Sequence, residues 1–357
     1  MQETGFLKSD LGYESVAFCA PYWRLIGDES MSQQKSCVTA FLALGSLLGI
    51  LGLTAISLLT SHYGWKLYLE VFSHFQLQYL ILSLFSLIIL ALTRYTRLFL
   101  VGLICTTLLA TQIVTWYWPP KFLMSGDRGN FRILIANVNT RNKQYAEVLA
   151  FTRQEDPDLA LFMEVDEAWI TQLNDLSQDL PYFSGEGRSS NFGIALYSRY
   201  AFEEMQLKVF GDDRTPSLVG ELKINNQPLF LVGTHPLPPA RSHFFHSRNR
   251  QLDLIGQHLQ TTQKPQLLIG DLNISMWSPY YKRLMRQTGL KNARKGFGLL
   301  PSWPTQGTYP QMPTWMPLLF SIPIDHCLLS SGIEVVDVYV GPKLGSDHHP
   351  LVVDLRL

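Results

Sequence analysis

The chain has 357 residues, which exceeds one average domain and is long enough to bury a large core. Its 29 basic residues balance its 29 acidic residues, which argues against a strongly basic nucleic-acid clamp without excluding a local patch. The four cysteines share no metal-ligand spacing, and only Cys327 falls in the large polar part of the chain. A disulfide framework within that part is therefore excluded.

The distribution of apolar and charged residues divides the chain into four expected segments. Residues 1–37 are polar and mixed and predict a loosely ordered tail, whereas 38–118 hold nearly all of the excess apolar residues. Residues 119–130 are expected to form a linker, because they begin with two prolines that end the preceding helix. From 131 to 357 the composition is that of a soluble α/β domain.

Three apolar runs within residues 38–118 predict three membrane-spanning helices. Val38–Thr60, Phe75–Thr93 and Leu98–Trp118 contain no charged residue. Each approaches the roughly 20 apolar residues that a spanning helix needs. Buried helices of a soluble core are the alternative, but three uncharged runs in succession are rare in soluble folds. A cleavable signal peptide fits poorly, because two further runs follow the first. We therefore expect an all-α anchor that contacts the lipid bilayer.

Basic residues in the short flanks predict the orientation of this anchor. Lys35 precedes the first run, and Arg94 and Arg97 lie between the second and the third. The first connection carries Lys66 as its single Lys or Arg residue. The bias places the N-terminus in the cytoplasm and everything after Trp118 outside it.

Short apolar runs after residue 130 predict strands, and two periodic segments predict helices. The helices are Tyr145–Glu155 and Arg248–Gln260. The strands are 131–136, 158–163, 193–197, 229–233, 266–270, 324–329 and a terminal strand that begins at Leu351.

Polar residues stand at or beside the ends of six of these strands. One polar residue at a strand end is ordinary, and Asx turns or solvated strand ends explain single cases. Six endings drawn from Asn, Asp, Glu and His are difficult to attribute to capping alone. The residues are Asn137 with Asn139, Glu164, His235, Asp271 with Asn273, Asp325 with His326, and Asp347 with His348.

These side chains suit metal-assisted attack of water on a phosphate ester. Carboxylate and amide oxygens are the ligands that Mg²⁺ or Mn²⁺ prefers. An Asp can orient or deprotonate water, and a His can donate a proton to a phosphate oxygen. Zinc is disfavoured, because the set is dominated by oxygen and contains no Cys pair.

The motifs resemble those of the endonuclease/exonuclease/phosphatase superfamily, the group with the DNase I-like fold, and occur in that family's order across residues 131–357. The resemblance implies an α/β (α+β) four-layer sandwich, with two mixed β-sheets packed face to face and helices outside. It also implies a metal-dependent hydrolase of phosphate esters. The matching motifs are Ala136–Asn139, Met163–Val165, Thr234-His235, Gly270–Asn273, Ile324–His326 and Gly345–Pro350.

The resemblance assigns metal ligands and one substrate-binding residue. Asn137 and Glu164 would bind Mg²⁺ or Mn²⁺, and Asp347 would assist them or hold a second ion. Asn139 would contact the substrate.

It also assigns five catalytic residues. Asp271 and Asn273 would handle the nucleophilic water and the phosphate. Asp325 would orient His348, and His235 would contact the phosphate or the leaving group. His326 and His349 have no role in the family pattern and are expected to be structural.

His235 is followed by Pro236–Pro239, and the predicted helix contains Arg248–Leu252; both features resemble the membrane-anchored bacterial branch of the family. Arg248 and Arg250 could grip an acidic substrate group, or could form salt bridges on a helix surface. The aromatic segment 296–317 could stack a base, dip toward lipid, or cover an apolar surface. The expected location is a bacterial inner membrane, with the catalytic domain on the non-cytoplasmic side.

The expected function is therefore a membrane-anchored phosphoesterase that acts on a phosphodiester or phosphomonoester. Nucleic acid, a phospholipid headgroup and a sugar phosphate remain alternative substrates, and no obligate protein partner is evident. The competing hypothesis is a catalytically inactive, membrane-bound binding or assembly module of the same fold. Such a module is expected to have lost a ligand, yet the full set of motif residues is present.

Overall fold

The structure, a computed structural model, describes residues 36–64, 66–119, 129–211, 213–224 and 227–357. The chain divides into two compact units. The smaller contains Leu80–Leu108 and the described part of Met1–Thr54, and the larger contains Ala55–Tyr79 and Leu109–Leu357. Nearly all of the predicted tail and linker lies outside the described residues. The predicted domain limits remain a prediction, and the larger unit begins well before residue 131.

Three apolar helices are present where the sequence predicts them: α3 (Ser36–His62), α5 (Gln76–Leu92) and α6 (Thr96–Val114). By length and composition, Cys37–His62 and Thr96–Tyr117 can each cross a membrane. α5 has 17 residues and is shorter than the other two. The expectation of three spanning helices is thus supported for two of the three.

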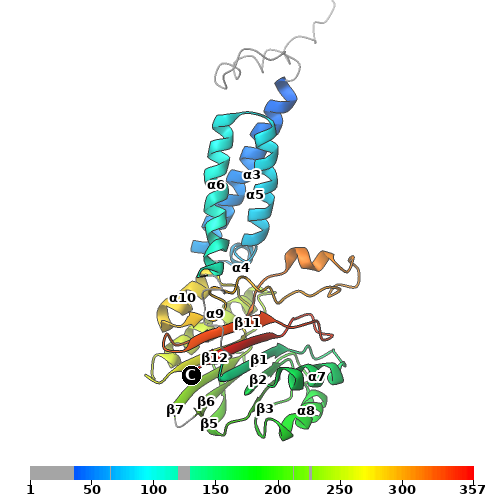
Figure 1. The fold of residues 1–357 in the computed structure, drawn as a ribbon, viewed down its shortest axis with the longest axis vertical. Helices are drawn as coiled ribbons and strands as arrows, with labels where there is room; N and C mark the ends of the chain where they lie inside the picture. Colours follow the sequence, from blue (N-terminus) through cyan, green and yellow to red (C-terminus); the bar gives the residue numbers. More distant parts are fainter. Residues whose placement is uncertain (1–35, 65, 120–128, 212, 225–226) are drawn as a thin grey trace, which may run out of the picture. The chain divides into compact units, whose positions relative to one another are not determined.

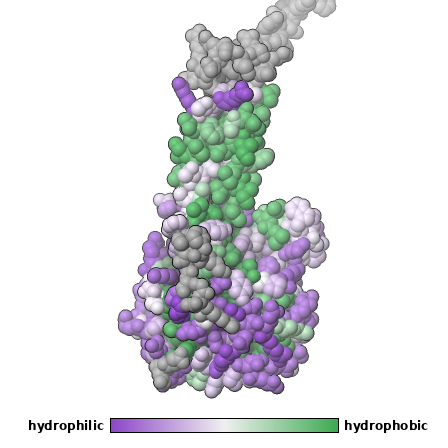
Figure 2. All heavy atoms as spheres, viewed as in Figure 1, coloured by the Kyte–Doolittle hydropathy of each residue, from purple (hydrophilic) through white to green (hydrophobic). Residues whose placement is uncertain are grey.

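The parts of these helices in the smaller unit share a narrow apolar core. Ala43, Leu47, Ile50, Leu87 and Leu90 form this cluster, and the partly buried Tyr95, Leu98 and Phe99 pack against it. Many of the other large side chains are exposed. Figure 2 shows the outward surface of these helices as predominantly apolar.

A short helix that the sequence did not predict, α4 (Leu67–Phe72), lies between α3 and α5 and belongs to the larger unit. Its single acidic residue, Glu70, is fully buried. The connection predicted as a loop between the first two apolar helices is therefore partly helical, and it contains a buried charge.

The first sheet of the larger unit has the strand order β11-β12-β1-β2-β4-β3 (Figure 1). β1 and β2 are parallel, and the remaining neighbours are antiparallel. α7 (Tyr145–Glu155) and α8 (Glu167–Leu173) pack on its outer face. The strands are β1 (Phe131–Asn137), β2 (Leu159–Met163), β3 (Tyr182–Glu186), β4 (Ile194–Ser198), β11 (Glu334–Val340) and β12 (Leu351–Arg356).

The second sheet has the order β5-β6-β7-β8-β10-β9. β7 and β8 are parallel. α9 (Ser242–Leu259) and α10 (Pro279–Thr288) lie outside it, and α9 buries one apolar side against the sheet. The strands are β5 (Phe202–Val209), β6 (Pro216–Ile224), β7 (Gln227–Thr234), β8 (Gln266–Asp271), β9 (Lys291–Asn292) and β10 (Asp325–Leu329).

One apolar core joins the inner faces of the two sheets. Ile133 and Leu161 of the first sheet belong to the same buried cluster as Leu231 and Ile269 of the second. This confirms the predicted architecture of two mixed sheets packed face to face with helices outside.

The sequence does not predict several helices and strands, because their apolar residues are few or are interrupted by polar ones. β5 has most of its residues exposed or half-exposed, as an edge strand does. α10 begins at Pro279, after the N-cap Ser278, and has a low content of apolar residues. Besides α4, the unpredicted α-helices and strands are β3, β5, β6, β9, β11, α8 and α10.

Gly270 allows the ends of β7 and β8 to approach each other at the candidate site. Its φ is +139°, and a Cβ built on it would lie 1.9 Å from the carbonyl oxygen of Thr234. A side chain therefore cannot be accommodated without moving the backbone. The close approach brings His235, after β7, beside Asp271 at the end of β8.

Candidate active site

Strand register brings the predicted residues together at one edge of the sandwich. In the first sheet Asn137 pairs with Met163, so Glu164 follows directly beside Asn137. In the second sheet Asp325 pairs with Asp271. Residues that are far apart in the sequence therefore meet where parallel strands end, which is a common location for catalytic side chains.

Asn137 is a central donor of the site. Its Nδ2 donates hydrogen bonds to Glu164 Oε1 at 3.0 Å and to Asp271 Oδ2 at 3.2 Å. One amide from the first sheet thus contacts a carboxylate from each sheet.

Asp325 and His348 form a buried pair. His348 Nδ1 lies 2.9 Å from Asp325 Oδ2, and both side chains are almost fully buried. Burial by itself lowers the pKa of His348, but the carboxylates of Asp325 and Asp271 raise it to about 10. Burial would raise the pKa of Asp325, yet His348 holds it below its usual range. The pair is therefore an imidazolium beside a carboxylate.

The second nitrogen of His348 faces the rest of the site. Nε2 lies 3.6 Å from Asp271 Oδ2 and 3.5 Å from Asn137 Nδ2. Because Nδ1 is held by Asp325, Nε2 is the atom that can donate to a substrate oxygen. Asp325 contacts the ring that it is predicted to orient, and its orienting role remains a prediction.

His235 lies on the other side of Asp271. Its Nε2 is 3.4 Å from Asp271 Oδ2 and 4.0 Å from Glu164 Oε1. Burial lowers the pKa of His235, but the hydrogen bond and charge of Asp271 outweigh it and raise the pKa. A second imidazole is thereby held next to the same carboxylate.

Asn273 is tied to Asp271 through its backbone. Its N–H donates to Asp271 Oδ1 at 2.8 Å, and its Nδ2 donates to the Pro236 carbonyl at 3.0 Å. Asn273 adopts a left-handed conformation with φ of 51°, which Asn tolerates better than most residues.

Asp347 is held by two donors rather than by the central cluster. Asn139 Nδ2 donates to Oδ1 at 2.7 Å, and Trp303 Nε1 donates to Oδ2 at 3.1 Å. Asn139 therefore positions Asp347, while its predicted contact with substrate stays a prediction. Trp303 was not among the predicted site residues. Its segment was recognised as aromatic, but no strand or motif in it marked this tryptophan.

Glu164 has the features of a cation ligand. Asn137 engages Oε1, while Oε2 is buried and has no hydrogen-bond partner within the described chain. Burial raises the pKa of Glu164, against the opposing effect of His235. Its backbone is left-handed, with φ of 58°, a conformation that costs a Glu about 1–2 kcal/mol. An open, buried carboxylate oxygen in a strained residue fits Mg²⁺ or Mn²⁺.

Besides Glu164, a group of three side chains in the site could also bind a cation. Suitable atoms of Asp271, Asp325 and His348 lie within 4.8 Å of one another. Since His348 and Asp325 already bond to each other, this group fits proton handling better than cation binding.

The structure does not place Arg248 where it could grip a substrate. Arg248 is fully buried and pairs with Glu70 at 3.1 Å. A guanidinium enclosed and neutralised in this way has no open face for a substrate group, so the expected role is corrected. Arg250, two residues further along α9, is exposed, and its predicted role remains a prediction.

The two histidines next to the motif residues have structural contacts, as expected. His326 Nε2 donates to the Ile274 carbonyl at 2.7 Å, while Nδ1 lies 3.1 Å from Asn292 Nδ2. Burial, together with Arg294, lowers the pKa of His326 to about 3, so the ring is neutral. His349 Nδ1 lies 3.0 Å from the Gly341 carbonyl.

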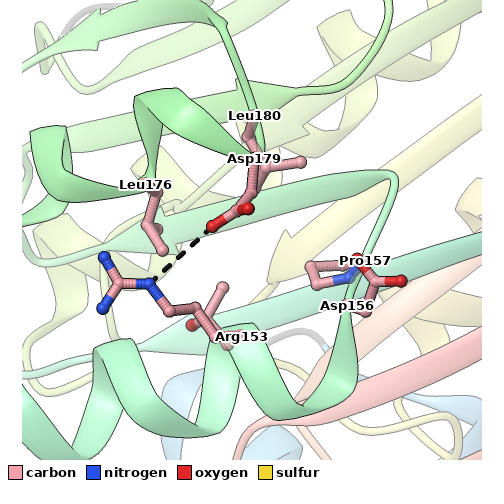
Figure 3. A pocket seen from close by; sticks show the side chains of 7 residues that line it. Arg153, Asp156, Pro157, Leu176, Asp179 and Leu180 are labelled. Atoms are coloured by element: carbon pink, nitrogen blue, oxygen red, sulfur yellow. Dashed lines mark ion pairs between the residues drawn. The ribbon is translucent and has the colours of Figure 1, made fainter.

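A small hollow elsewhere on the larger unit holds none of the predicted residues. Figure 3 shows it between α7 and the helical turn η3 (Asn174–Gln178), with Arg153 and Asp179 paired at 3.7 Å. It contains no cluster of unpaired acids or histidines, among the residues that line it, and we assign it no chemistry.

Oxygen ligands beside two imidazoles suit one reaction class in particular, the hydrolysis of phosphate esters. The chain belongs to the Endonuclease/Exonuclease/phosphatase family, whose model matches residues 134–348, more than half of the chain. The expected family and enzyme class are thereby confirmed. No curated protein shows significant sequence similarity to the chain.

Solved structures share the fold at low sequence identity. D. rerio TDP2, complexed with a single-strand DNA product, is 14% identical with a TM-score of 0.53, covering 64% of this chain and 99% of its own. The human Nocturnin catalytic domain, with a bound sulfate, is 19% identical with a TM-score of 0.50, covering 66% and 98%. An endonuclease/exonuclease/phosphatase from Beutenbergia cavernae is 19% identical with a TM-score of 0.50, covering 64% and 72%.

We predict that Asp325→Asn lowers hydrolysis of bis(p-nitrophenyl) phosphate about 100-fold or more, because His348 loses the charge that keeps it cationic. Steady-state kinetics on the full chain in detergent, with circular dichroism to verify folding, would measure this. His348→Gln is expected to cause a similar loss, and Asp175→Asn, at an exposed acid on η3, should cause none. Activity near that of the unmodified chain in both site variants would exclude a role for the pair.

Proposed function

We propose that this protein is a membrane-anchored phosphoesterase that depends on a divalent cation and cleaves a phosphodiester or phosphomonoester with water. The observation that carries the proposal is the open, buried Oε2 of Glu164, next to an amide and a second carboxylate. Asn137 and Glu164 would hold Mg²⁺ or Mn²⁺, with Asp347 assisting. When bound, the cation would neutralise charge on the phosphate and the leaving oxygen.

The residues of the chain supply the remaining steps. Asp271 orients the attacking water and accepts its proton. Three donor groups from both sheets fix the position of its carboxylate. His348 donates through Nε2 to a phosphate or leaving-group oxygen, while Asp325 holds the ring. His235 stabilises the developing negative charge from the opposite side, and Asn273 holds Asp271 in place.

The substrate stays within the class of phosphate esters. TDP2 bound to a DNA product and Nocturnin bound to sulfate are consistent with recognition of a phosphate group by this fold. The balanced charge of the chain favours none of nucleic acid, phospholipid headgroup or sugar phosphate over the others.

The alternative of an inactive binding module is disfavoured by the contacts of the site. An inactive relative has no need to retain a strained Glu164 or a buried ion pair between Asp325 and His348. Both features have a cost that catalysis explains.

We expect Glu164→Ala and Asp271→Ala to abolish Mg²⁺-dependent hydrolysis of bis(p-nitrophenyl) phosphate while the fold persists. One variant removes a cation ligand, and the other removes the group that activates water. Mg²⁺ at about 100 times its dissociation constant should stabilise the unmodified chain by about 2.7 kcal/mol. Glu164→Ala should lose this stabilisation in a thermal melt.

Glu147→Ala, at an exposed acid on α7, is the matched control and should behave as the unmodified chain. Retained hydrolysis in both site variants would refute the assignment. A melt that does not respond to Mg²⁺, together with absent activity, would favour the inactive module.

Membrane anchoring is supported by the exposure of the apolar helices. In the most apolar windows of Cys37–His62 and Thr96–Tyr117, 28% and 22% of the residues are buried. Core helices of a soluble protein are mostly buried, so these surfaces need an apolar surrounding. The proposal includes a bacterial inner membrane because of the resemblance to the membrane-anchored bacterial branch. The basic flanks support a catalytic unit outside the cytoplasm.

The chain is expected to stay in the membrane fraction at alkaline pH and to be released by detergent. A reporter fused after Leu357 that is active only outside the cytoplasm should be active, and a fusion after Arg94 should be inactive. Release by alkali would exclude integral anchoring. The reverse pattern of reporters would reverse the orientation.

A further inference from the structure

The segment 66–75, between α3 and α5, belongs to the same compact unit as the two sheets. It contains α4, and Glu70 in this helix has none of its surface exposed. Buried carboxylates are rare unless they are paired. The partners of Glu70 therefore indicate what this segment does.

Glu70 forms a buried ion pair with α9. Its Oε2 lies 3.1 Å from Arg248 Nη2, and both side chains are fully buried. Ser278 Oγ donates to Oε1 at 2.6 Å, and His74 Nε2 lies 3.4 Å from Oε2. Burial alone would raise the pKa of Glu70, but Arg248 and His74 hold it well below its usual range. Glu70 is therefore ionised.

The same arginine reaches the loop that follows Asp271. Arg248 Nη1 donates to the backbone carbonyl of Asn273 at 2.6 Å. The N–H of Asn273 in turn donates to Asp271 Oδ1 at 2.8 Å. From the other side, His74 Nδ1 lies 2.8 Å from Ser275 Oγ. The segment thus contacts this loop at two points.

The ion pair sets the direction in which Arg248 points. The Glu70 and Arg248 atoms are close but not aligned as a hydrogen bond, so their attraction is mainly electrostatic. Removing one partner of a buried pair leaves an uncompensated charge and is strongly destabilising. Without Glu70, the unpaired Arg248 guanidinium is expected to move toward water. It would then lose its hydrogen bond to the Asn273 carbonyl.

We propose that Glu70 and Arg248 are positioning residues for phosphate ester hydrolysis: their ion pair holds the Arg248 guanidinium on the Asn273 carbonyl and so fixes the loop that carries Asp271 and Asn273. The inference rests on the proposed hydrolytic function. It makes segment 66–75 a part of the catalytic unit, so residues 131–357 alone do not form the complete enzyme.

The test uses the full chain in nanodiscs, with bis(p-nitrophenyl) phosphate and Mg²⁺ as the probes. Glu70→Gln should lower kcat roughly 10- to 100-fold, as small displacements of catalytic groups do, with little change in KM. Arg248→Met should have a similar effect. Arg248→Lys keeps the charge and a donor and should recover part of kcat.

Tyr280→Phe is the matched control. It removes a 2.6 Å hydrogen bond from Tyr280 Oη to the carbonyl of Gly64, in the same connection between α3 and α5, without touching Asn273. Its kcat should equal that of the unmodified chain. Glu70→Gln and Arg248→Met proteins with lower melting temperatures but unchanged kcat would overturn the inference. An inactive unmodified chain would instead overturn the proposed function.

A second, independent observation concerns the loop that carries η4 (Met316–Phe320). Trp315, Leu318, Leu319 and Phe320 have 55%, 47%, 54% and 50% of their surfaces exposed. Residues 309–320 contain no charged side chain. An exposed apolar patch of this kind marks an interaction surface.

This loop is attached to the first turn of α5. Gln78 Nε2 donates to the carbonyls of Leu319 at 3.1 Å and Ser321 at 3.4 Å. We infer that the loop inserts into the interfacial region of the lipid bilayer beside the start of α5. Tryptophan is enriched at that depth, and uncharged apolar residues suit lipid better than a polar protein partner. This inference rests on the proposed anchoring.

The experiment places an environment-sensitive fluorophore at Leu319→Cys, in a full chain without native cysteines and reconstituted in nanodiscs. Blue-shifted emission and strong quenching by headgroup-level lipid quenchers are expected. The same label at Asp175→Cys should show neither. A label at position 319 that behaves like the label at 175 would overturn the insertion, while alkaline extraction separately tests the anchor.

Discussion

Asp271, a buried carboxylate, is the group around which both sheets must be arranged. It is 1% exposed and lies within hydrogen-bonding or ion-pair distance of Asn137 from one sheet and His235 from the other. A buried charge is costly unless partners surround it. The parallel pairs β1–β2 and β7–β8, together with the missing side chain at Gly270, bring those partners to one edge. The sandwich thus holds the Asp271 carboxylate among donors from both of its sheets.

Glu164 is a residue at which the arrangement of the site lowers the stability of the fold. Glu164 has a left-handed backbone and one buried oxygen without a partner in the described chain. Asn137 and Thr140 hold it there, through its side chain and its carbonyl respectively. Strain and an unsatisfied oxygen on one residue are expected at a site built for a ligand, and they distinguish Glu164 from an ordinary strand end.

Arg248 shows where a local interpretation of sequence fails. An arginine in a polar helix is compatible with a substrate contact or with a surface salt bridge, and the pattern cannot separate them. Its actual partner, Glu70, comes from the connection between α3 and α5, where the sequence predicts neither a helix nor a buried charge. The compact unit that holds the site consequently includes residues upstream of the predicted domain. Burial of charge, rather than helix periodicity, decided the role of this residue.

The sequence by itself determined the central strands, the order of the motifs and the family. Continuous apolar runs ended by Asn, Asp, Glu or His carry that information locally, as at Asn137 and Asp271. Only the tertiary structure decided the edge strand β5, the contact of Trp303 with Asp347 and the pairing of Glu70 with Arg248. Each of these depends on which surfaces are buried together. Burial brings together residues that are distant in the chain. A local sequence pattern does not show which of them will be buried against each other.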